Sequence, residues 1–263
     1  MIKIFTVDAF TDDAFNGNPA AVCLPDFPLD EKMMQNIAFE MNLSETAFVF
    51  KSNGAFNLRW FTPECEVDLC GHATLASAHI LWQEKFLAKN EPAVFQTLYK
   101  GILKANFNDP HITLDFPVNV PVKCKDIPKL NHALGVAPKT LLETEHHYLA
   151  ELNSEEEVIN ATPDFESLKN LSKYGIIITS VSDTDSFDFI SRFFAPKKGI
   201  NEDPVTGSAH CVLAPYWSEK LGKSSLSAYQ ASKRGGALKI ALKKDRVLIS
   251  GKAVTIISGI LNL

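Results

Sequence analysis

Two segments of the sequence place a glycine and polar side chains at the start of an expected apolar helix. The run HATLASAHILW follows Cys70-Gly71, and the run SAHCVLAPYW follows Thr206-Gly207. A helix N-terminus presents unpaired N–H groups and a partial positive charge, so it binds anions such as carboxylates. Glycine at that point allows the backbone to approach a ligand closely. Both segments are therefore candidate binding points for a small anionic substrate.

The two segments belong to an internal repeat. Each is preceded by a strand-like stretch with the pattern arginine, aromatic, phenylalanine, any residue, proline: Arg59-Trp60-Phe61-Thr62-Pro63 and Arg192-Phe193-Phe194-Ala195-Pro196. Both of the following helices are apolar on nearly every side, which is typical of a helix enclosed by a sheet. The repeat predicts two pseudo-symmetric lobes, each a sheet or half-barrel wrapped around one buried helix. The N-termini of the two helices are expected to face each other across a cleft that holds the active site.

The remaining pattern predicts a mixed α/β chain of the α+β type. A helix with Met34, Ile37, Ala38 and Met41 on its apolar face is expected after the capping residue Asp30, and a second over residues 165–171. Expected strands cover residues 2–10, 46–50, 56–61, 112–116, 175–181, 187–194, 238–242, 246–249 and 254–261. Long parallel βαβ units are not obvious in this order.

A cluster of prolines, Pro117, Pro121 and Pro128, marks the expected crossing between the lobes. The predicted N-terminal lobe covers residues 1–117 and is joined by the C-terminal strand, about residues 254–263. The predicted C-terminal lobe covers residues 118–253.

Composition narrows the class of protein. The chain has 263 residues, of which 46% are hydrophobic and 22% charged, so it is not a disordered chain. A net charge of −5 gives no bulk attraction for nucleic acid or an anionic membrane. We expect no membrane span and no signal peptide. The five cysteines include no CxxC pair, so we expect reduced thiols and a cytoplasmic protein.

Two other polar clusters are weaker candidates. Glu143, Glu145, His146 and His147 contain metal-binding residue types, but adjacent histidines diverge on a strand and no third ligand is placed, so a solvated loop is expected. The segment Ser232-Lys233-Arg234-Gly235-Gly236 resembles a phosphate loop in composition only, and a tight turn with a basic rim is expected. No metal site and no cofactor are predicted.

Several motifs taken together resemble the phenazine-biosynthesis PhzF-like family. They follow in order along essentially the whole chain: Asp8-Ala9-Phe10, Phe15-Asn16-Gly17-Asn18-Pro19-Ala20-Ala21-Val22, Leu43-Ser44-Glu45-Thr46-Ala47-Phe48-Val49, Phe61-Thr62-Pro63, Cys70-Gly71-His72-Ala73-Thr74 and Glu202-Asp203-Pro204-Val205-Thr206-Gly207-Ser208-Ala209. The resemblance implies a diaminopimelate-epimerase-like fold with the site between two halves. It also implies a homodimer and a cofactor-free isomerisation in a biosynthetic process, of which the best-known case acts on a dihydro-hydroxyanthranilate.

The same resemblance marks the site residues. It implies catalytic roles for Glu45, His72 and Asp203, and substrate-binding roles for Asn18, Ser44, Gly71, Ala73, Gly207 and Ser208. Four of these, Glu45, His72, Asp203 and Ser208, are expected to converge within roughly 10 Å, the span of a small-ligand pocket.

The residue types agree with those roles. Glu45 begins an apolar strand, where a carboxylate held against apolar walls can donate as well as accept a proton. His72 lies in the first turn of a helix, where the helix dipole favours a neutral imidazole. Asp203, held extended by Pro204, is expected to pair with His72 or to hold a substrate ammonium group. Ser208 is a natural cap for the second helix.

Cys70 separates two chemistries. The resemblance implies a fold that is shared with epimerases and racemases, which use two thiols, one before each helix glycine. Here Thr206 stands at the second position, and its hydroxyl cannot replace a thiolate base. We therefore expect a cofactor-independent isomerase that acts on a small carboxylate through one general acid/base group. The alternatives are an amino-acid racemase or epimerase that uses Cys70 as a reactive thiol, and a catalytically silent binding protein on the same fold.

Overall fold

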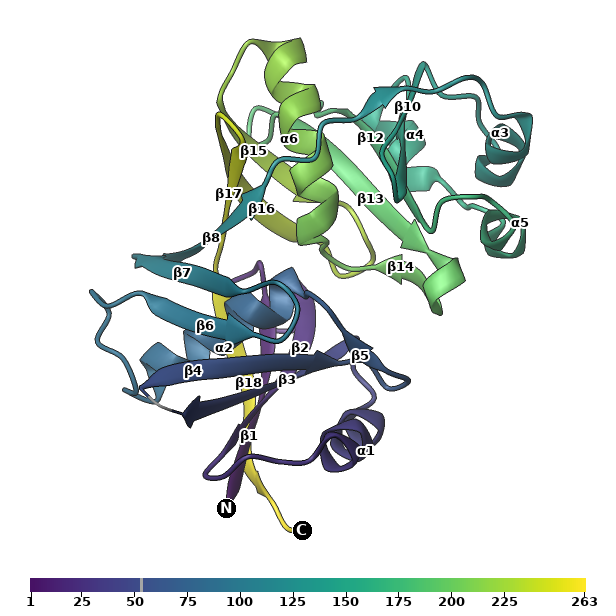
Figure 1. The fold of residues 1–263 in the computed structure, drawn as a ribbon. Coiled ribbons are helices and arrows are strands. Elements are labelled where there is room, and N and C mark those ends of the chain that lie inside the picture. Colours follow the sequence, from purple (N-terminus) through teal and green to yellow (C-terminus); the bar gives the residue numbers. More distant parts are fainter. Residues whose placement is uncertain (53) are drawn as a thin grey trace. The chain divides into compact units, whose positions relative to one another are not determined.

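The computed structural model describes residues 1–52 and 54–263, which form two compact units (Figure 1). Unit 1 contains Met1–Asp115 and Ser250–Leu263, and unit 2 contains Phe116–Ile249. The chain passes from one unit to the other within β8 (His111–Pro117) and returns within β17 (Arg246–Gly251). Each unit has its own buried helix and its own cluster of buried hydrophobic side chains.

The elements of unit 1 alternate strands with two helices. In chain order they are β1 (Ile2–Ala9), β2 (Asn18–Pro25), α1 (Glu31–Met41), β3 (Glu45–Ser52), β4 (Ala55–Phe61), β5 (Glu66–Val67), α2 (Gly71–Gln83), β6 (Ala93–Thr97), β7 (Ile102–Asn108), β8 and the C-terminal β18 (Ala253–Leu261). β1 lies antiparallel between β2 and β18. The C-terminal strand therefore completes the N-terminal unit.

Unit 2 repeats this order. Its elements are β9 (Val122–Lys123), α3 (Pro128–Leu134), β10 (Thr140–Glu143), β11 (His147–Glu151), α4 (Glu155–Asn160), α5 (Phe165–Lys169), β12 (Gly175–Val181), β13 (Phe189–Ala195), the 3₁₀ turn η1 (Pro196–Lys198), β14 (Ile200–Asp203), α6 (Gly207–Leu221), β15 (Ser225–Gln230), β16 (Gly236–Lys243) and β17. The series β1 to β7 of unit 1 corresponds to β10 to β16 of unit 2, with the same succession of antiparallel and parallel pairs. The internal repeat is a structural duplication.

Within residues 1–52 and 54–263, four parallel strand pairs are joined through helices, which corrects the expectation that parallel units are not obvious. β2 pairs with β3 across α1, β4 with β6 across α2, β11 with β12 across α4 and α5, and β13 with β15 across α6. The crossover helix α5 lies within the predicted helix over residues 165–171, whereas α4 has only six residues, too few for a helical period to be visible in the sequence.

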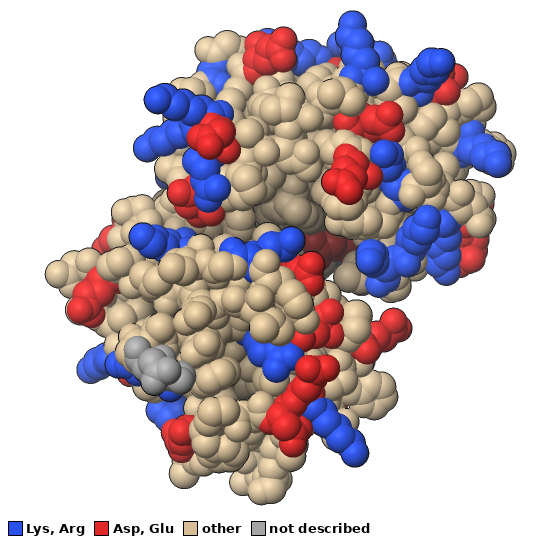
Figure 2. Space-filling model, viewed as in Figure 1, with Lys and Arg blue, Asp and Glu red and all other residues tan. Residues whose placement is uncertain are grey.

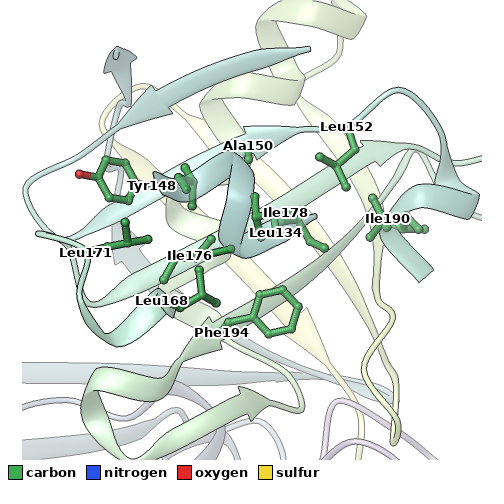
Figure 3. Close-up of a cluster of buried hydrophobic side chains, with 13 residues drawn as sticks. Leu134, Tyr148, Ala150, Leu152, Leu168, Leu171, Ile176, Ile178, Ile190 and Phe194 are labelled. Atoms are coloured by element: carbon green, nitrogen blue, oxygen red, sulfur yellow. The ribbon is translucent and has the colours of Figure 1, made fainter. Parts of the chain in front are cut away.

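The predicted local features of α1 are present. Asp30 is the N-cap, and its side chain accepts a hydrogen bond from the Met33 amide at 2.7 Å. Met34, Ile37 and Ala38 are buried against Phe48 and Phe61 of the adjacent strands. In unit 2 the corresponding layer consists of α3, α4 and α5, whose Leu134, Val158 and Leu168 join Ile176, Ile178 and Phe194 of the sheet (Figure 3).

The helix α2 is buried on nearly every side, as the sequence predicts, whereas α6 is buried mainly over its first half. Ten of the 13 residues of α2 and eight of the 15 residues of α6 are buried. Because apolar residues surround these helices, their N-termini are fixed points to which each sheet can bring polar side chains. None of the helices in residues 1–52 and 54–263 is both long and apolar enough to cross a membrane.

The repeated arginines hold equivalent positions. Arg59 makes a bidentate pair with Glu66 at 2.6 and 2.7 Å and lies over the ring of Phe61. Arg192 makes the same pair with Glu202 at 2.6 and 2.9 Å and lies over the ring of Phe194. The R-aromatic-F-x-P pattern therefore encodes a duplicated structural clamp.

Acidic and basic side chains are interspersed on the face of each unit that Figure 2 shows. This distribution accompanies the modest net charge of −5.

Candidate active site

The polar cluster of unit 1 lies where two parallel strands begin. Asn18 is the first residue of β2 and Glu45 is the first residue of β3, and the register places Ala20 opposite Glu45. Parallel strands begin at the same sheet edge, so both side chains arise at one place. α2 packs against β1, β2 and β3 and brings His72, in its first turn, to the same edge.

Four predicted site residues meet there. His72 Nε2 lies 3.2 Å from Glu45 Oε2, and the Asn18 side-chain amide lies within hydrogen-bond distance of His72 Nδ1, at 3.1 Å. Cys70 Sγ lies 3.5 Å from His72 Nδ1 and 3.9 Å from Nε2. His72 and Cys70 are buried, and the Glu45 side chain keeps 13% of its surface exposed.

The loop before Asn18 explains part of the spacing in Phe15-Asn16-Gly17-Asn18. The Asp8 carboxylate accepts a hydrogen bond from the Phe15 amide at 2.8 Å. Gly17 has φ +65°, and a Cβ there would lie 2.2 Å from the Ala9 carbonyl oxygen. Only glycine fits this turn, which fixes the position of the next residue, Asn18.

The charge state of His72 differs from the expectation. Burial alone would lower the pKa of His72, but the adjacent Cys70 sulfur and Glu45 carboxylate raise it well above its usual value. The prediction of a neutral imidazole, based on the helix dipole, is therefore wrong. A carboxylate 3.2 Å away outweighs the partial charge of a helix end.

Cys70 is not poised as a thiolate. Burial and the Glu45 charge raise the pKa of the thiol to about 11, so it is protonated near neutral pH. The Glu45 carboxylate is consequently the charge that sustains the His72 imidazolium. The cluster contains a carboxylate and an imidazole 3.2 Å apart, with a neutral thiol beside them.

The corresponding position in unit 2 carries a hydrogen-bonded polar group. Asp203 ends β14, Thr206 is the N-cap of α6 and Gln230 ends β15. The Thr206 hydroxyl donates to Asp203 Oδ2. Gln230 Oε1 accepts the Thr206 amide proton at 2.8 Å, and its Nε2 donates to the Asp203 carbonyl at 2.7 Å and to Thr206 Oγ1 at 3.1 Å.

Gln230 is a site residue that sequence reasoning missed. It is fully buried and connects both sides of the Asp203–Thr206 turn, so it fixes the orientation of the Asp203 carboxylate. The available signal was a single amide at the end of the alternating strand SLSAYQ, where β-branched or aromatic residues are usual.

Ser208 does not cap α6. The N-cap is Thr206, and Ser208 lies in the first turn of the helix with its side chain exposed. The predicted capping role is therefore wrong, and the reason is that the extended residue before Gly207 already occupies the cap position. The exposed hydroxyl of Ser208 and the amide groups of the first turn remain available to a ligand.

The two weaker clusters have structural roles. Residues 144–146 form the turn between β10 and β11, and Glu145 and His146 are exposed as expected. His147 is instead buried against Tyr174 and Phe193, and burial lowers its pKa to about 4. Residues 232–236 form the predicted turn between β15 and β16, in which Ser232 Oγ donates to the Pro204 carbonyl at 2.8 Å.

Comparison with known proteins agrees with this architecture. Residues 7–259 match the family described as phenazine biosynthesis-like protein (PhzC-PhzF). An "Uncharacterized isomerase" of Halalkalibacterium halodurans is 51% identical over 255 residues, which cover 97% of this chain and 96% of that protein. The crystal structure of a PhzF-family protein of Enterococcus faecalis has a TM-score of 0.95 and 44% identity, covering 100% of this chain and 99% of that one.

A more distant structure shows the fold alone. A Pseudomonas aeruginosa protein described as a predicted epimerase has a TM-score of 0.78 at 20% identity and covers 99% of both chains. On the match of residues 7–259 and the similarity over nearly the whole chain, this protein belongs to the PhzF-like family and has a diaminopimelate-epimerase-like fold.

Proposed function

We propose that this protein is a cofactor-independent isomerase that moves a proton within a small carboxylate-bearing substrate. The observation that carries the proposal is the 3.2 Å pair of Glu45 and His72 at the N-terminus of α2, beside a neutral Cys70. The name of the Halalkalibacterium halodurans relative, an isomerase, supports the reaction class.

In the proposed reaction Glu45 accepts a proton from an allylic carbon of the substrate. The electron pair of the broken C–H bond forms a new double bond, and the original double bond takes up the proton at its far carbon. Glu45 returns that proton on the same face, so one carboxyl group suffices. The His72 imidazolium stabilises the negative charge that develops in the substrate, and Asn18 fixes the orientation of the ring.

Substrate binding is assigned to the helix ends. The amide groups of Gly71 and Ala73 in α2, and of Gly207 and Ser208 in α6, suit the carboxylate of a substrate. Ser44, half-buried beside Glu45, adds a hydroxyl. Asp203, oriented by Thr206 and Gln230, is proposed to hold a donor group of the substrate, and the convergence of these groups with Glu45 is part of the proposal.

Two observations disfavour the racemase alternative. A two-base racemisation needs a thiolate on each side of the α-carbon, but Thr206 stands at the position equivalent to Cys70. Cys70 itself has a pKa of about 11, which leaves little thiolate near neutral pH.

A homodimer is proposed on the family resemblance and on the surface of β18. Ile257 and Ile260 of this strand are 56% and 53% exposed, which is unusual for isoleucine on a strand. Light scattering coupled to size exclusion tests this, with wild type dimeric. If an Ile257→Lys variant still has the mass of a dimer in solution, β18 is not the dimer interface.

Proton NMR in deuterated water tests the proposed reaction. A panel of small allylic carboxylates is incubated with wild type, with Glu45→Gln and with Glu40→Gln, which changes an exposed glutamate of α1. The double bond of at least one compound should shift with wild type and Glu40→Gln but not with Glu45→Gln. Compounds that bind without any shift or exchange would instead favour the silent binding protein.

A further inference from the structure

We propose that Glu45, Cys70 and His72 form a binding site for a divalent transition-metal ion, with Zn²⁺ the ion best matched to the donors. The inhibitory consequence drawn below rests on the proposed function, whereas the metal site does not. The ion is not proposed as a cofactor of the isomerisation, because it would bind the same atoms that the proton transfer uses.

The donor atoms are already close together. One ligand atom from each of the three residues lies within 4.8 Å of the other two, and no other group of three His, Cys, Asp or Glu side chains in residues 1–52 and 54–263 does the same. His72 Nε2 lies 3.2 Å from Glu45 Oε2 and 3.9 Å from Cys70 Sγ. A tetrahedral zinc ion at about 2.0–2.1 Å from N and O and about 2.3 Å from S separates such ligands by roughly 3.3–3.6 Å. The two separations that involve His72 differ from this range by a few tenths of an ångström, and the Glu45–Cys70 separation, within 4.8 Å, would need to close by about 1 Å at most.

One oxygen of the Glu45 carboxylate is buried without a hydrogen-bond partner. Its Oε2 is buried, yet no hydrogen bond to it has acceptable geometry, although His72 Nε2 is only 3.2 Å away. The ring N–H axis therefore does not point at this oxygen. His72 Nε2 and Glu45 Oε2 are therefore placed so that, once Nε2 has lost its proton, both atoms can direct a lone pair at a metal ion between them.

Another buried carboxylate shows that this arrangement is unusual. Glu151 in unit 2 is also buried, and its oxygens are fully engaged by the Tyr216 hydroxyl and the Lys220 ammonium group. A structural carboxylate in this protein is thus neutralised by side chains of the same unit. Glu45 lacks a lysine or arginine partner among the ion pairs of the described residues.

Asn18 suits the histidine form that binds metal. Coordination through Nε2 requires a hydrogen on Nδ1, and the Asn18 side-chain amide lies 3.1 Å from Nδ1. Rotating the amide by a half-turn presents its oxygen to that hydrogen, which fixes the tautomer as outer partners of zinc-bound histidines do. The donor set of one sulfur, one nitrogen and one oxygen favours Zn²⁺ or Co²⁺ over Mg²⁺ and Ca²⁺, which prefer oxygen ligands.

Occupation of the site would stop the proposed isomerisation. The carboxylate oxygen that is to receive the substrate proton would be bound to the ion, and the imidazole would lose its positive charge. Two anionic ligands, the carboxylate and a thiolate, would balance the charge of the divalent ion. Zinc is therefore expected to act as an inhibitor that a chelator removes.

Cobalt spectroscopy of the substrate-free, full-length protein tests the site. Titration with Co²⁺ should reach one equivalent and produce a sulfur-to-cobalt charge-transfer band in the near ultraviolet, which Zn²⁺ abolishes by displacement and Mg²⁺ does not. Cys70→Ser should eliminate the band. Glu45→Gln should weaken cobalt binding by about tenfold or more, the size of effect that even outer partners of metal ligands produce.

The matched control is Cys65→Ser, which removes an exposed free thiol from the same unit. The control should keep the band at full intensity. Absence of the band in wild type, its persistence in Cys70→Ser, or its loss in Cys65→Ser would overturn the metal site. Circular dichroism confirms folding of each variant, and Glu45→Gln provides the second, independent variant if Cys70→Ser does not fold.

Activity then separates the two proposals. Inhibition of wild type by Zn²⁺, reversed by a chelator, supports the inhibitory role. A cobalt band without any isomerase activity would uphold the site and remove the proposed function together with the inhibitory role. A cobalt band with activity that Zn²⁺ does not change would overturn the inhibitory role alone.

Discussion

The N-termini of α2 and α6 are equivalent by the internal repeat but carry different chemistry. The α2 end brings together Cys70, His72 and Glu45, a thiol, an imidazole and a carboxyl group. At the α6 end the Thr206 hydroxyl donates to the Asp203 carboxylate, and the Gln230 side-chain amide bonds the Asp203 carbonyl and the Thr206 amide of the same turn. Equivalent helix ends of the duplicated framework therefore carry ionisable side chains in unit 1 and a hydrogen-bonded polar group in unit 2, and we propose that the first moves protons and the second holds substrate groups in place.

The histidines near these ends differ in the same way. Neighbouring negative groups raise the pKa of His72 despite its burial. Burial lowers the pKa of His210 to about 4, and its Nδ1 lies 2.8 Å from the Thr206 carbonyl, to which it donates as a neutral ring. Meanwhile the arginine clamps of Arg59 and Arg192 have stayed alike. The framework is thus duplicated faithfully, while the polar groups at the helix ends have diverged.

The largest expected effect is the loss of the proton carrier in unit 1. Glu45→Gln should lower turnover by about 10²–10⁴-fold, because a positioned acid/base group contributes that much to the rate. The measurement is kcat for a substrate identified by the NMR screen. Glu40→Gln should retain wild-type turnover, and a Glu45→Gln enzyme with near-normal kcat would remove Glu45 from its role.

The next effect concerns the hydrogen-bonded group of Asp203, Thr206 and Gln230 in unit 2. Gln230→Leu leaves the Thr206 amide and the Asp203 carbonyl buried without their partner, at a cost of about 1–3 kcal/mol for each such group. Urea unfolding should show this loss, and KM should rise more than kcat falls. Gln96→Leu, at an exposed position on the equivalent strand β6, is the control and should unfold at nearly the wild-type midpoint.

The two histidines predict opposite pH dependences of stability. The raised pKa of His72 contributes stability that is fully present below about pH 6.5 and is lost as pH rises through the folded-state value. For His210 the unfolded state takes up the proton first, so its contribution is present above about pH 6.5 and is lost as pH falls toward 4. His147, whose pKa is also about 4, adds to this acid limb.

Urea unfolding midpoints measured above and below pH 6.5 separate the stability contribution of His72 from that of His210. His72→Gln should flatten the alkaline limb, and His210→Gln should reduce the acid limb. His132→Gln, at an exposed position on α3, should leave both limbs unchanged. An alkaline limb that survives in folded His72→Gln protein would contradict the charged state assigned to His72.

The smallest expected effect is at the thiol. Because Cys70 is protonated near neutral pH, Cys70→Ser and Cys70→Ala should keep turnover within about tenfold of wild type, less than the contribution of an acid/base group. Solvent deuterium exchange at the α-carbon of amino acids provides the companion measurement and should be undetectable in wild type. Severe loss of isomerase activity in folded Cys70→Ser protein would restore the thiol chemistry.

Much of the framework follows from local sequence patterns. The Asp30 cap, the apolar face of α1 and the starts of both buried helices depend on neighbouring residues, so they could be predicted. The position of Glu45 at the first residue of β3 follows in the same way from the apolar run after it.

The remaining features depend on distant partners. Gln230 reaches Thr206 from a strand that follows the whole of α6, and Asn18 reaches His72 from another strand. The pKa of His72 is set by Glu45, which is brought to it only by the parallel pairing of β2 and β3. Sequence spacing carries no direct signal for such contacts, which explains the wrong prediction for His72 and the missed Gln230.

The most direct test of the central claim follows a label through one turnover. A substrate that carries deuterium at the migrating position is converted in ordinary water, and the product is examined for deuterium at the new position. One carboxyl group that takes and returns the proton on a single face should transfer part of the label in wild type and in Cys70→Ser. Glu45→Gln should give no product within the same time. Product that never contains the label, together with loss of turnover in Cys70→Ser, would contradict the single acid/base mechanism.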